Sequence, residues 1–161
     1  MEAYVMDAFS ASLFGGNQAG VVLPDRPLTD AEMQQIAAEF KHSETAFVTR
    51  SPDGSVILRY FTPAGEVELC GHATIASFTV LRERRAIGPG TYALHTRSGD
   101  LSIQVGADAV WMDMAPPADG RSFSGPHYVL PGIGAHEYDA AELSDGRLLF
   151  VAGDVQGTPV G

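Results

Sequence analysis

Apolar and polar residues follow two different periods along the chain, and each period predicts one type of element. In residues 28–40 the apolar positions recur at the spacing of one face of an α-helix. Thr29 and Glu32 form a capping box at its start, and Leu28 can pack against Met33 as a hydrophobic staple. We therefore predict an amphipathic, structural helix whose buried face consists of Met33, Ile36, Ala37 and Phe40.

Residues 73–81 are apolar on nearly every face of a helix. A surface helix has one apolar stripe, so a helix without a polar face is predicted to be buried. We expect this helix to open at Cys70-Gly71-His72. Its polar residues begin at Arg82, where cations suit the negative end of the helix dipole, and Gly88 is expected to stop it.

Short apolar segments predict strands on either side of the two helices. They lie at residues 4–9, 21–23, 47–48, 55–61, 92–97, 101–105, 110–114 and 148–151. Strands joined by tight turns and interrupted by only two helices indicate an α+β fold with a mixed, mainly antiparallel sheet. Pro116-Pro117 marks a domain boundary, with one domain at 1–117 and, at 118–161, an incomplete second domain or an irregular tail.

Composition narrows the class of protein. The chain has 161 residues and a formal net charge of −10, which argues against nucleic-acid binding because that function needs a basic face. Its single cysteine excludes an internal disulfide. No leader pattern and no apolar run near 20 residues are found, so neither secretion nor a membrane span is predicted. We expect a cytoplasmic protein.

A glycine-rich segment at residues 13–20 raises the question of a phosphate loop. Its glycines do not fit the dinucleotide-binding spacing, and a strand follows instead of a helix, so we reject that interpretation. The simpler explanation is a turn that needs glycine for its backbone angles. Asn17 could present its amide to a ligand or could hold the turn.

Ser43 and Glu44 lie between the first helix and the strand that follows. A glutamate partly removed from water there would have a raised pKa and could act as a general acid or base. The alternative is a solvated loop carboxylate, because buried glutamates are rare. Ser43 could cap the backbone or contact a ligand.

Cys70 and His72 lie where a buried helix is predicted to start. Free N–H groups at a helix N-terminus bind anions and favour the thiolate of a cysteine. Cys70 could equally be a small buried hydrophobe, and His72 could bond to the backbone or to water. The two residues lack a second cysteine, and the other histidines are scattered, so we predict no metal site.

Four segments together resemble the PhzF phenazine-biosynthesis family in order and spacing. They are residues 4–9, 16–21, 43–48 and 61–74, and the resemblance covers roughly residues 1–117. It implies the fold of diaminopimelate epimerase, in which two similar halves each wrap a curved antiparallel sheet around a central helix. The active site of that fold lies between the two helix N-termini.

The resemblance also implies cofactor-independent isomerase or epimerase chemistry, in which a proton moves within a small unsaturated or amino carboxylic acid. Glu44 would be the general acid/base. Cys70 lies where the related epimerases have a catalytic thiol, although it could serve only as a wall of the pocket. The implied substrate-binding residues are Asn17, Ser43, Gly71, His72 and Ala73.

The chain departs from the family in length, since family members are nearly twice as long. The residues that would face Glu44 come from their second half, so we expect a homodimer or a complementary chain to supply them. One small sheet should leave part of the central helix uncovered, with Ile75, Phe78 and Val80 on a patch that a partner would bury. The alternative is a non-catalytic small-molecule-binding half-protein or an inactive fragment.

Overall fold

The computed structural model describes residues 1–10, 15–112, 128–129, 136–142 and 148–154. The chain forms two compact units, Met1–Met114 and Ala115–Gly161, and each is considered by itself. The predicted boundary at Pro116-Pro117 lies outside the described residues.

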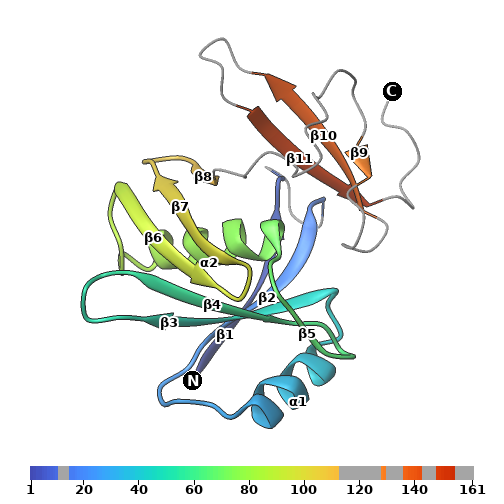
Figure 1. Ribbon diagram of the computed structural model, residues 1–161, viewed down its shortest axis with the longest axis vertical. Helices are drawn as coiled ribbons and strands as arrows, with labels where there is room; N and C mark the ends of the chain where they lie inside the picture. The colour runs from blue at the N-terminus through green and yellow to red at the C-terminus, as the bar shows by residue number, and fades with distance from the viewer. Residues whose placement is uncertain (11–14, 113–127, 130–135, 143–147, 155–161) are drawn as a thin grey trace. The chain divides into compact units, whose positions relative to one another are not determined.

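One sheet of eight strands forms the first unit (Figure 1). Its order is β1 (Glu2–Ala8), β2 (Asn17–Leu23), β3 (Glu44–Arg50), β4 (Val56–Phe61), β6 (Gly90–Thr96), β7 (Gly99–Val105) and β8 (Val110–Met112), with β5 (Glu66–Val67) paired to β4. The pairs β2–β3 and β4–β6 are parallel, and the others are antiparallel. The predicted mixed, mainly antiparallel sheet and the α+β class are confirmed.

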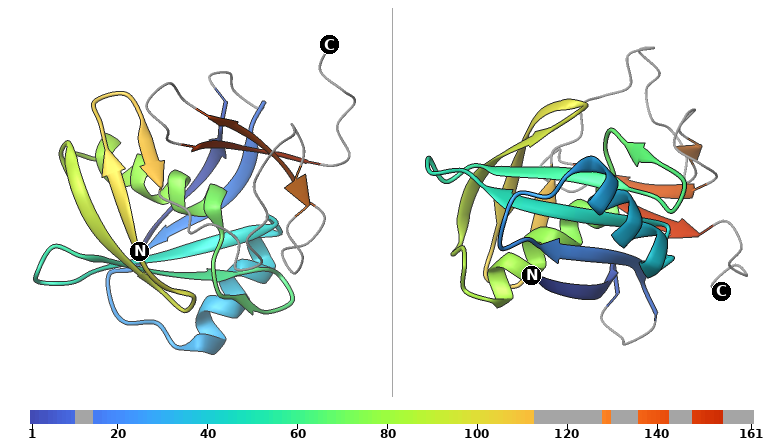
Figure 2. Two further views of the ribbon diagram at one scale, coloured as in Figure 1. Left: turned by 45° about the horizontal axis from the view of Figure 1, so that its top comes forward. Right: turned by 90° about the horizontal axis from the view of Figure 1, so that it is seen from below.

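The helix α2 (Gly71–Glu83) runs inside the curve of this sheet (Figure 2). Its three hydroxyl side chains each bond to a carbonyl of their own helix. Thr74 Oγ1, Ser77 Oγ and Thr79 Oγ1 donate to carbonyl oxygens four residues earlier, at 2.7 to 2.8 Å. Hydroxyls that bond back in this way allow an otherwise apolar helix to be enclosed.

The sheet covers α2 more completely than the sequence suggested. Phe78 and Val80 are 0% and 3% exposed, and both belong to a core that includes Leu58, Leu94 and Ile103. The expectation that they would lie uncovered is wrong, because α2 contacts strands from both ends of the sheet order, β1 and β8 among them. Ile75 is partly buried.

The helix α1 (Asp30–Phe40) packs on the other face of the sheet, in a second core that contains Val22, Phe47 and Phe61. The predicted capping box is present, with Glu32 N–H donating to Thr29 Oγ1 and Thr29 N–H donating to Glu32 Oε2. This helix is structural, as predicted.

The end of α2 differs from the prediction. The helix ends at Glu83, and Arg85 adopts a left-handed conformation with φ of 58°. The N–H groups of Ala86 and Ile87 then donate to the carbonyl of Leu81. Arg85 thus takes the position that Gly88 was expected to fill.

The glycine-rich segment at residues 13–20 also differs from the prediction of a turn that needs glycine for its backbone angles. Strand β2 already begins at Asn17, and neither Gly16 nor Gly20 is among the described glycines with positive φ. A Cβ on Gly16 would lie 2.4 Å from the carbonyl oxygen of Ala8, and one on Gly20 would lie 2.7 Å from Thr45 Oγ1. These glycines are required by close packing, so the prediction based on backbone angles is wrong for both.

The second unit contains a three-stranded antiparallel sheet, in the order β11 (Leu148–Asp154), β10 (His136–Glu142) and β9 (Tyr128–Val129). The strand predicted at residues 148–151 is confirmed, whereas β9 and β10 were not predicted. Among the described residues of the whole chain, no helix is long and apolar enough to cross a membrane.

Candidate active site

The sheet register brings the start of β3 to the start of α2. Ala19 of β2 pairs with Glu44, and Ala46 pairs with Tyr60 of β4. Alternate residues of a strand share a face, so Glu44 points to the same side as Ala46 and Val48, which belong to the core around α2. As the first residue of β3, Glu44 therefore reaches the N-terminus of that helix.

Three side chains meet there. His72 Nε2 lies 3.3 Å from Glu44 Oε2, and Cys70 Sγ lies 3.2 Å from His72 Nδ1. The side chains of His72 and Glu44 are only 5% and 12% exposed, and Cys70 is buried. The sequence analysis named all three as candidate site residues, and the structure brings them into direct contact.

Glu44 Oε2 has an unusual environment for a buried carboxylate oxygen. It is shielded from solvent and has no hydrogen-bond partner among the described residues, although His72 Nε2 lies 3.3 Å away. Buried polar atoms are normally paired, and an exception calls for an explanation. A bare oxygen at this position can accept a proton from a ligand or bind a cation. Glu44 is not the solvated loop carboxylate of the alternative interpretation.

Burial raises the pKa of the Cys70 thiol well above its ordinary value, and the charge of Glu44 raises it further. The backbone N–H groups of Ala73 and His72 lower this pKa, but their effect is smaller. The expectation that the helix N-terminus would favour a thiolate is therefore wrong, because loss of hydration outweighs the backbone groups. Cys70 is a protonated thiol at neutral pH.

A buried chain of hydroxyl groups fixes the start of α2. Thr74 Oγ1 donates to the carbonyl of Cys70 at 2.7 Å, and the Tyr60 hydroxyl lies 2.6 Å from Thr74 Oγ1. Since the single proton of Thr74 is used, Tyr60 must be the donor of the second bond. Burial raises the pKa of Tyr60, which keeps that donor proton in place. Sequence reasoning missed this pair, although a threonine in an apolar helix was a usable signal.

The other residues that the sequence analysis proposed for substrate binding differ in how deeply they are buried. Asn17 is half-buried and opens β2 opposite Ala8, on the face of the sheet that carries Glu44. Ser43 is exposed, immediately before β3. Ala73 is fully buried, so only its backbone could serve a ligand. Gly71 is different, because no described atom outside its chain neighbours and the backbone of its own helix lies within 4 Å of the position that a Cβ would occupy there.

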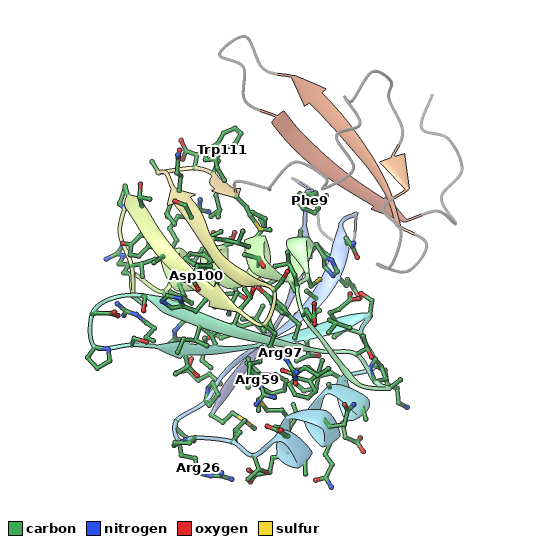
Figure 3. All side chains as sticks on the ribbon, viewed as in Figure 1. Phe9, Arg26, Arg59, Arg97, Asp100 and Trp111 are labelled. Atoms are coloured by element: carbon green, nitrogen blue, oxygen red, sulfur yellow. The ribbon has the colours of Figure 1, made fainter. Side chains whose placement is uncertain are left out.

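Charged residues on the face of the sheet that carries α1 are paired with one another. Glu66 binds Arg59 at 2.7 Å and Arg97 at 2.5 Å, and Arg59 also binds Asp30 at 2.6 Å. Both arginines are labelled in Figure 3. The hydrogen bond from Arg59 is the main cause of the lowered pKa of Glu66. Glu66, which lies in one of the four segments noted in the sequence, is therefore structural.

Glu44, Cys70 and His72 offer one ligand atom each, and these atoms all lie within 4.8 Å of one another. The sequence analysis considered Cys70 and His72 as a pair for a metal. It did not foresee that β3 would add a carboxylate as a third possible ligand.

Fold and site together define an α+β protein that encloses one helix in a curved mixed sheet. Acid–base side chains gather at the N-terminus of that helix. Residues 6–123 match the family described as phenazine biosynthesis-like protein (PhzC-PhzF). The chain belongs to this family.

Relatives support the assignment. An uncharacterized isomerase, YddE of Salmonella typhimurium, is 43% identical over 107 residues, which are 66% of this chain and 36% of that protein. The uncharacterized isomerase PA2770 of Pseudomonas aeruginosa is 39% identical over 142 residues, 88% of this chain and 54% of that protein. The chain thus spans 36% to 54% of the length of these two relatives.

A solved structure is also similar to this chain over part of its length. The crystal structure of a phenazine biosynthesis protein of the PhzF family from Enterococcus faecalis has a TM-score of 0.65 and 31% identity. The match covers 92% of this chain and 55% of that one. The predicted resemblance to the PhzF family is confirmed.

Proposed function

We propose that this chain carries the acid–base half of a cofactor-independent isomerase that moves a proton within a small unsaturated or amino carboxylic acid. The observation that carries the proposal is the Glu44 carboxylate. One of its oxygens is buried at the N-terminus of an enclosed helix and has no hydrogen-bond partner in the part of the chain that the structure describes. The isomerase names of the relatives support this class of reaction.

In the proposed reaction Glu44 takes a proton from a carbon next to the substrate's carboxylate or double bond. The C–H bond breaks, the electron pair moves into an enolate or a conjugated anion, and Glu44 returns the proton at the new position. The first N–H groups of α2, beginning at Gly71, would hold the carboxylate and stabilise the developing negative charge. The open space beside Gly71 gives a ligand access to them.

His72 and Cys70 have supporting roles in this proposal. His72 lies between the other two side chains, with Nε2 3.3 Å from Glu44 Oε2 and Nδ1 3.2 Å from Cys70 Sγ, and its ring limits the positions that the carboxylate can take. Cys70 remains protonated, so it cannot share the role of base at neutral pH, and it lines the pocket. Asn17 and Ser43 are proposed to contact the substrate from the neighbouring strand starts.

The remaining part of the site is proposed to come from a second copy or from a complementary chain. Such a partner would enclose the substrate from the open side of Gly71.

Proton exchange tests the proposal without knowledge of the natural substrate. The protein is incubated in heavy water with a panel of small amino and unsaturated carboxylic acids, and deuterium at carbon is followed by NMR. Exchange in at least one acid, lost in Glu44→Gln and retained in Glu39→Gln, is the expected result. Glu39 is a suitable control because it is an exposed glutamate on α1.

The second candidate is a non-catalytic module that binds such acids. The open space beside Gly71 favours it, since the first N–H groups of α2 could bind a carboxylate there without any proton transfer. Binding of an acid by calorimetry with no deuterium exchange, in every assembly state that the protein forms, would favour the module and contradict the isomerase.

A further inference from the structure

We propose that Glu44, Cys70 and His72 form a binding site for a thiophilic divalent cation of the zinc class. This site goes beyond the proposed isomerase function and does not depend on it. If both are correct, the cation inhibits the enzyme, because it occupies the base.

The donor set suits such a cation. Zinc is bound in proteins by cysteine sulfur, histidine nitrogen and carboxylate oxygen, in tetrahedral geometry. The three side chains here supply one atom of each kind, all within 4.8 Å of one another. They come from two rigid elements, the first residue of β3 and the first turn of α2 with its N-cap.

The distances are close to those that coordination requires. Bond lengths of about 2.0–2.3 Å and tetrahedral angles separate neighbouring ligand atoms by roughly 3.3–3.6 Å. His72 Nε2 lies 3.3 Å from Glu44 Oε2 and 4.0 Å from Cys70 Sγ. The first distance already fits, and a small rotation of the thiol would bring the second into range.

Charge is balanced when the cation binds. Coordination breaks the S–H bond of Cys70, its proton leaves to solvent, and the sulfur binds the metal as a thiolate. One thiolate and one carboxylate then neutralise a doubly charged cation, and His72 contributes a neutral nitrogen. A neutral complex is what a buried position tolerates, since unpaired buried charge is strongly unfavourable.

A separate observation also points to a missing ligand. Glu44 Oε2 is buried without a hydrogen-bond partner among the described residues, although it faces the ring nitrogen of His72. A cation between these groups would satisfy that oxygen. The fourth position would be filled by water or by a carboxylate that enters beside Gly71, where there is open space.

Cobalt(II) gives a direct test, because it replaces zinc in such sites and absorbs light according to its ligands. The full chain is titrated with Co²⁺ in the absence of substrate. We expect one ion per chain, visible bands of four-coordinate cobalt, an ultraviolet thiolate-to-cobalt band, and displacement by Zn²⁺. As Cys70 is the chain's single cysteine, that ultraviolet band can come from no other residue.

Matched variants assign the remaining ligands. His72→Asn and Glu44→Gln should each weaken cobalt binding at least tenfold, whereas His95→Asn and Glu39→Gln should not change it. His95 is a good control because it is an exposed histidine that already contacts a carboxylate, Asp100 at 2.7 Å. Cobalt binding without the thiolate band, or equally strong binding in His72→Asn, would overturn the proposal.

The wild-type spectrum keeps the test decisive even if a variant does not fold. Absence of the thiolate band from folded wild-type protein at millimolar Co²⁺ would end the metal proposal and leave the isomerase proposal intact. Conversely, a metal-bound protein that shows no proton exchange after chelation would contradict the isomerase and support the metal site.

Discussion

Glu44 and His72 come from different elements, yet Glu44 Oε2 lies 3.3 Å from His72 Nε2 in a nearly buried position. Parallel pairing of β2 with β3 places Glu44 on the face that α2 covers, and the first turn of α2 carries His72. The proposed acid–base chemistry follows from this contact. An amphipathic helix connects the two strands, as parallel pairing requires a crossover.

Replacement of Glu44 by glutamine should lower any proton-exchange rate by about 100- to 10,000-fold, because glutamine keeps the shape but cannot take up a proton. Ligand affinity and unfolding free energy should change little. Rates are measured by NMR in heavy water, with Glu39→Gln as the exposed control. An unchanged rate in Glu44→Gln would remove Glu44 from the mechanism.

The thiol of Cys70 should react slowly with iodoacetamide at pH 7, since burial and the charge of Glu44 raise its pKa. Its reaction should become fast after denaturation. Mass spectrometry follows the modification, and because the chain has one cysteine each added mass reports Cys70 alone. Rapid alkylation of the folded protein at neutral pH would show a reactive thiolate and would favour a catalytic role.

The hydrogen bonds that join Tyr60 to Thr74 and Thr74 to the carbonyl of Cys70 should together contribute more to the free energy of unfolding than the two bonds would separately. Thr74→Val leaves the buried Tyr60 hydroxyl without its acceptor, and we expect a loss of about 1–3 kcal/mol in unfolding free energy. Tyr60→Phe combined with Thr74→Val should cost less than the sum of the single changes. Urea unfolding measures all three variants. Thr79→Val is the control, and additive losses would argue against coupling between Tyr60 and Thr74.

Alanine substitutions at Gly16 and Gly71 should have very different effects on the stability of the fold. Gly16→Ala would place a methyl group 2.4 Å from the carbonyl of Ala8, and it should destabilise the fold by about 1–3 kcal/mol or more. Gly71→Ala meets no described atom beyond its chain neighbours and its own helix backbone within 4 Å, so stability should be unchanged or slightly higher. Thermal unfolding compares them. If a carboxylate enters beside Gly71, Gly71→Ala should also weaken its binding, and unchanged affinity would contradict that route.

Acid should weaken the fold partly through Glu32, whose pKa is lowered to about 2, chiefly by its hydrogen bond from Arg26 and then by the Thr29 backbone. A folded-state pKa below the unfolded value gives stability that is present above about pH 4.3 and is lost as the pH falls toward 2. Glu32→Gln should therefore show a smaller loss of unfolding free energy between pH 5 and pH 2 than wild type. An equal loss in the two proteins would show that the capping-box carboxylate does not contribute.

Association with a second copy is expected, and β1 is the surface to test. It forms one end of the described sheet order and exposes Val5 by 55%, and Phe9 just after it is 40% exposed (Figure 3). Edge strands with apolar side chains favour pairing with another chain. Light scattering should give a dimeric mass that Val5→Lys lowers and that Ile57→Lys, on central β4, does not. A monomeric wild type would contradict the expectation.

The sequence by itself determined both helices and most strands of the first unit, although it did not predict β5, β9 or β10. The capping box at Thr29 and the helical period after it specify α1, and the absence of a polar face predicts that α2 is buried. These features depend on local spacing and on side-chain hydrophobicity, which can be read from a single chain. Four other segments, residues 4–9, 16–21, 43–48 and 61–74, indicated the family, and two of them contain the candidates Glu44, Cys70 and His72.

Only the tertiary structure decided how these residues act on one another. The curl of the sheet buried Phe78 and Val80, which the sequence left uncovered. Enclosure reversed the expected effect of the helix N-terminus on Cys70, because loss of hydration depends on neighbours from distant strands. The same long-range packing brought Glu44 to Cys70 and His72 as a third possible ligand and joined Tyr60 to Thr74. None of these contacts has a sequence period, so no local pattern could have predicted them.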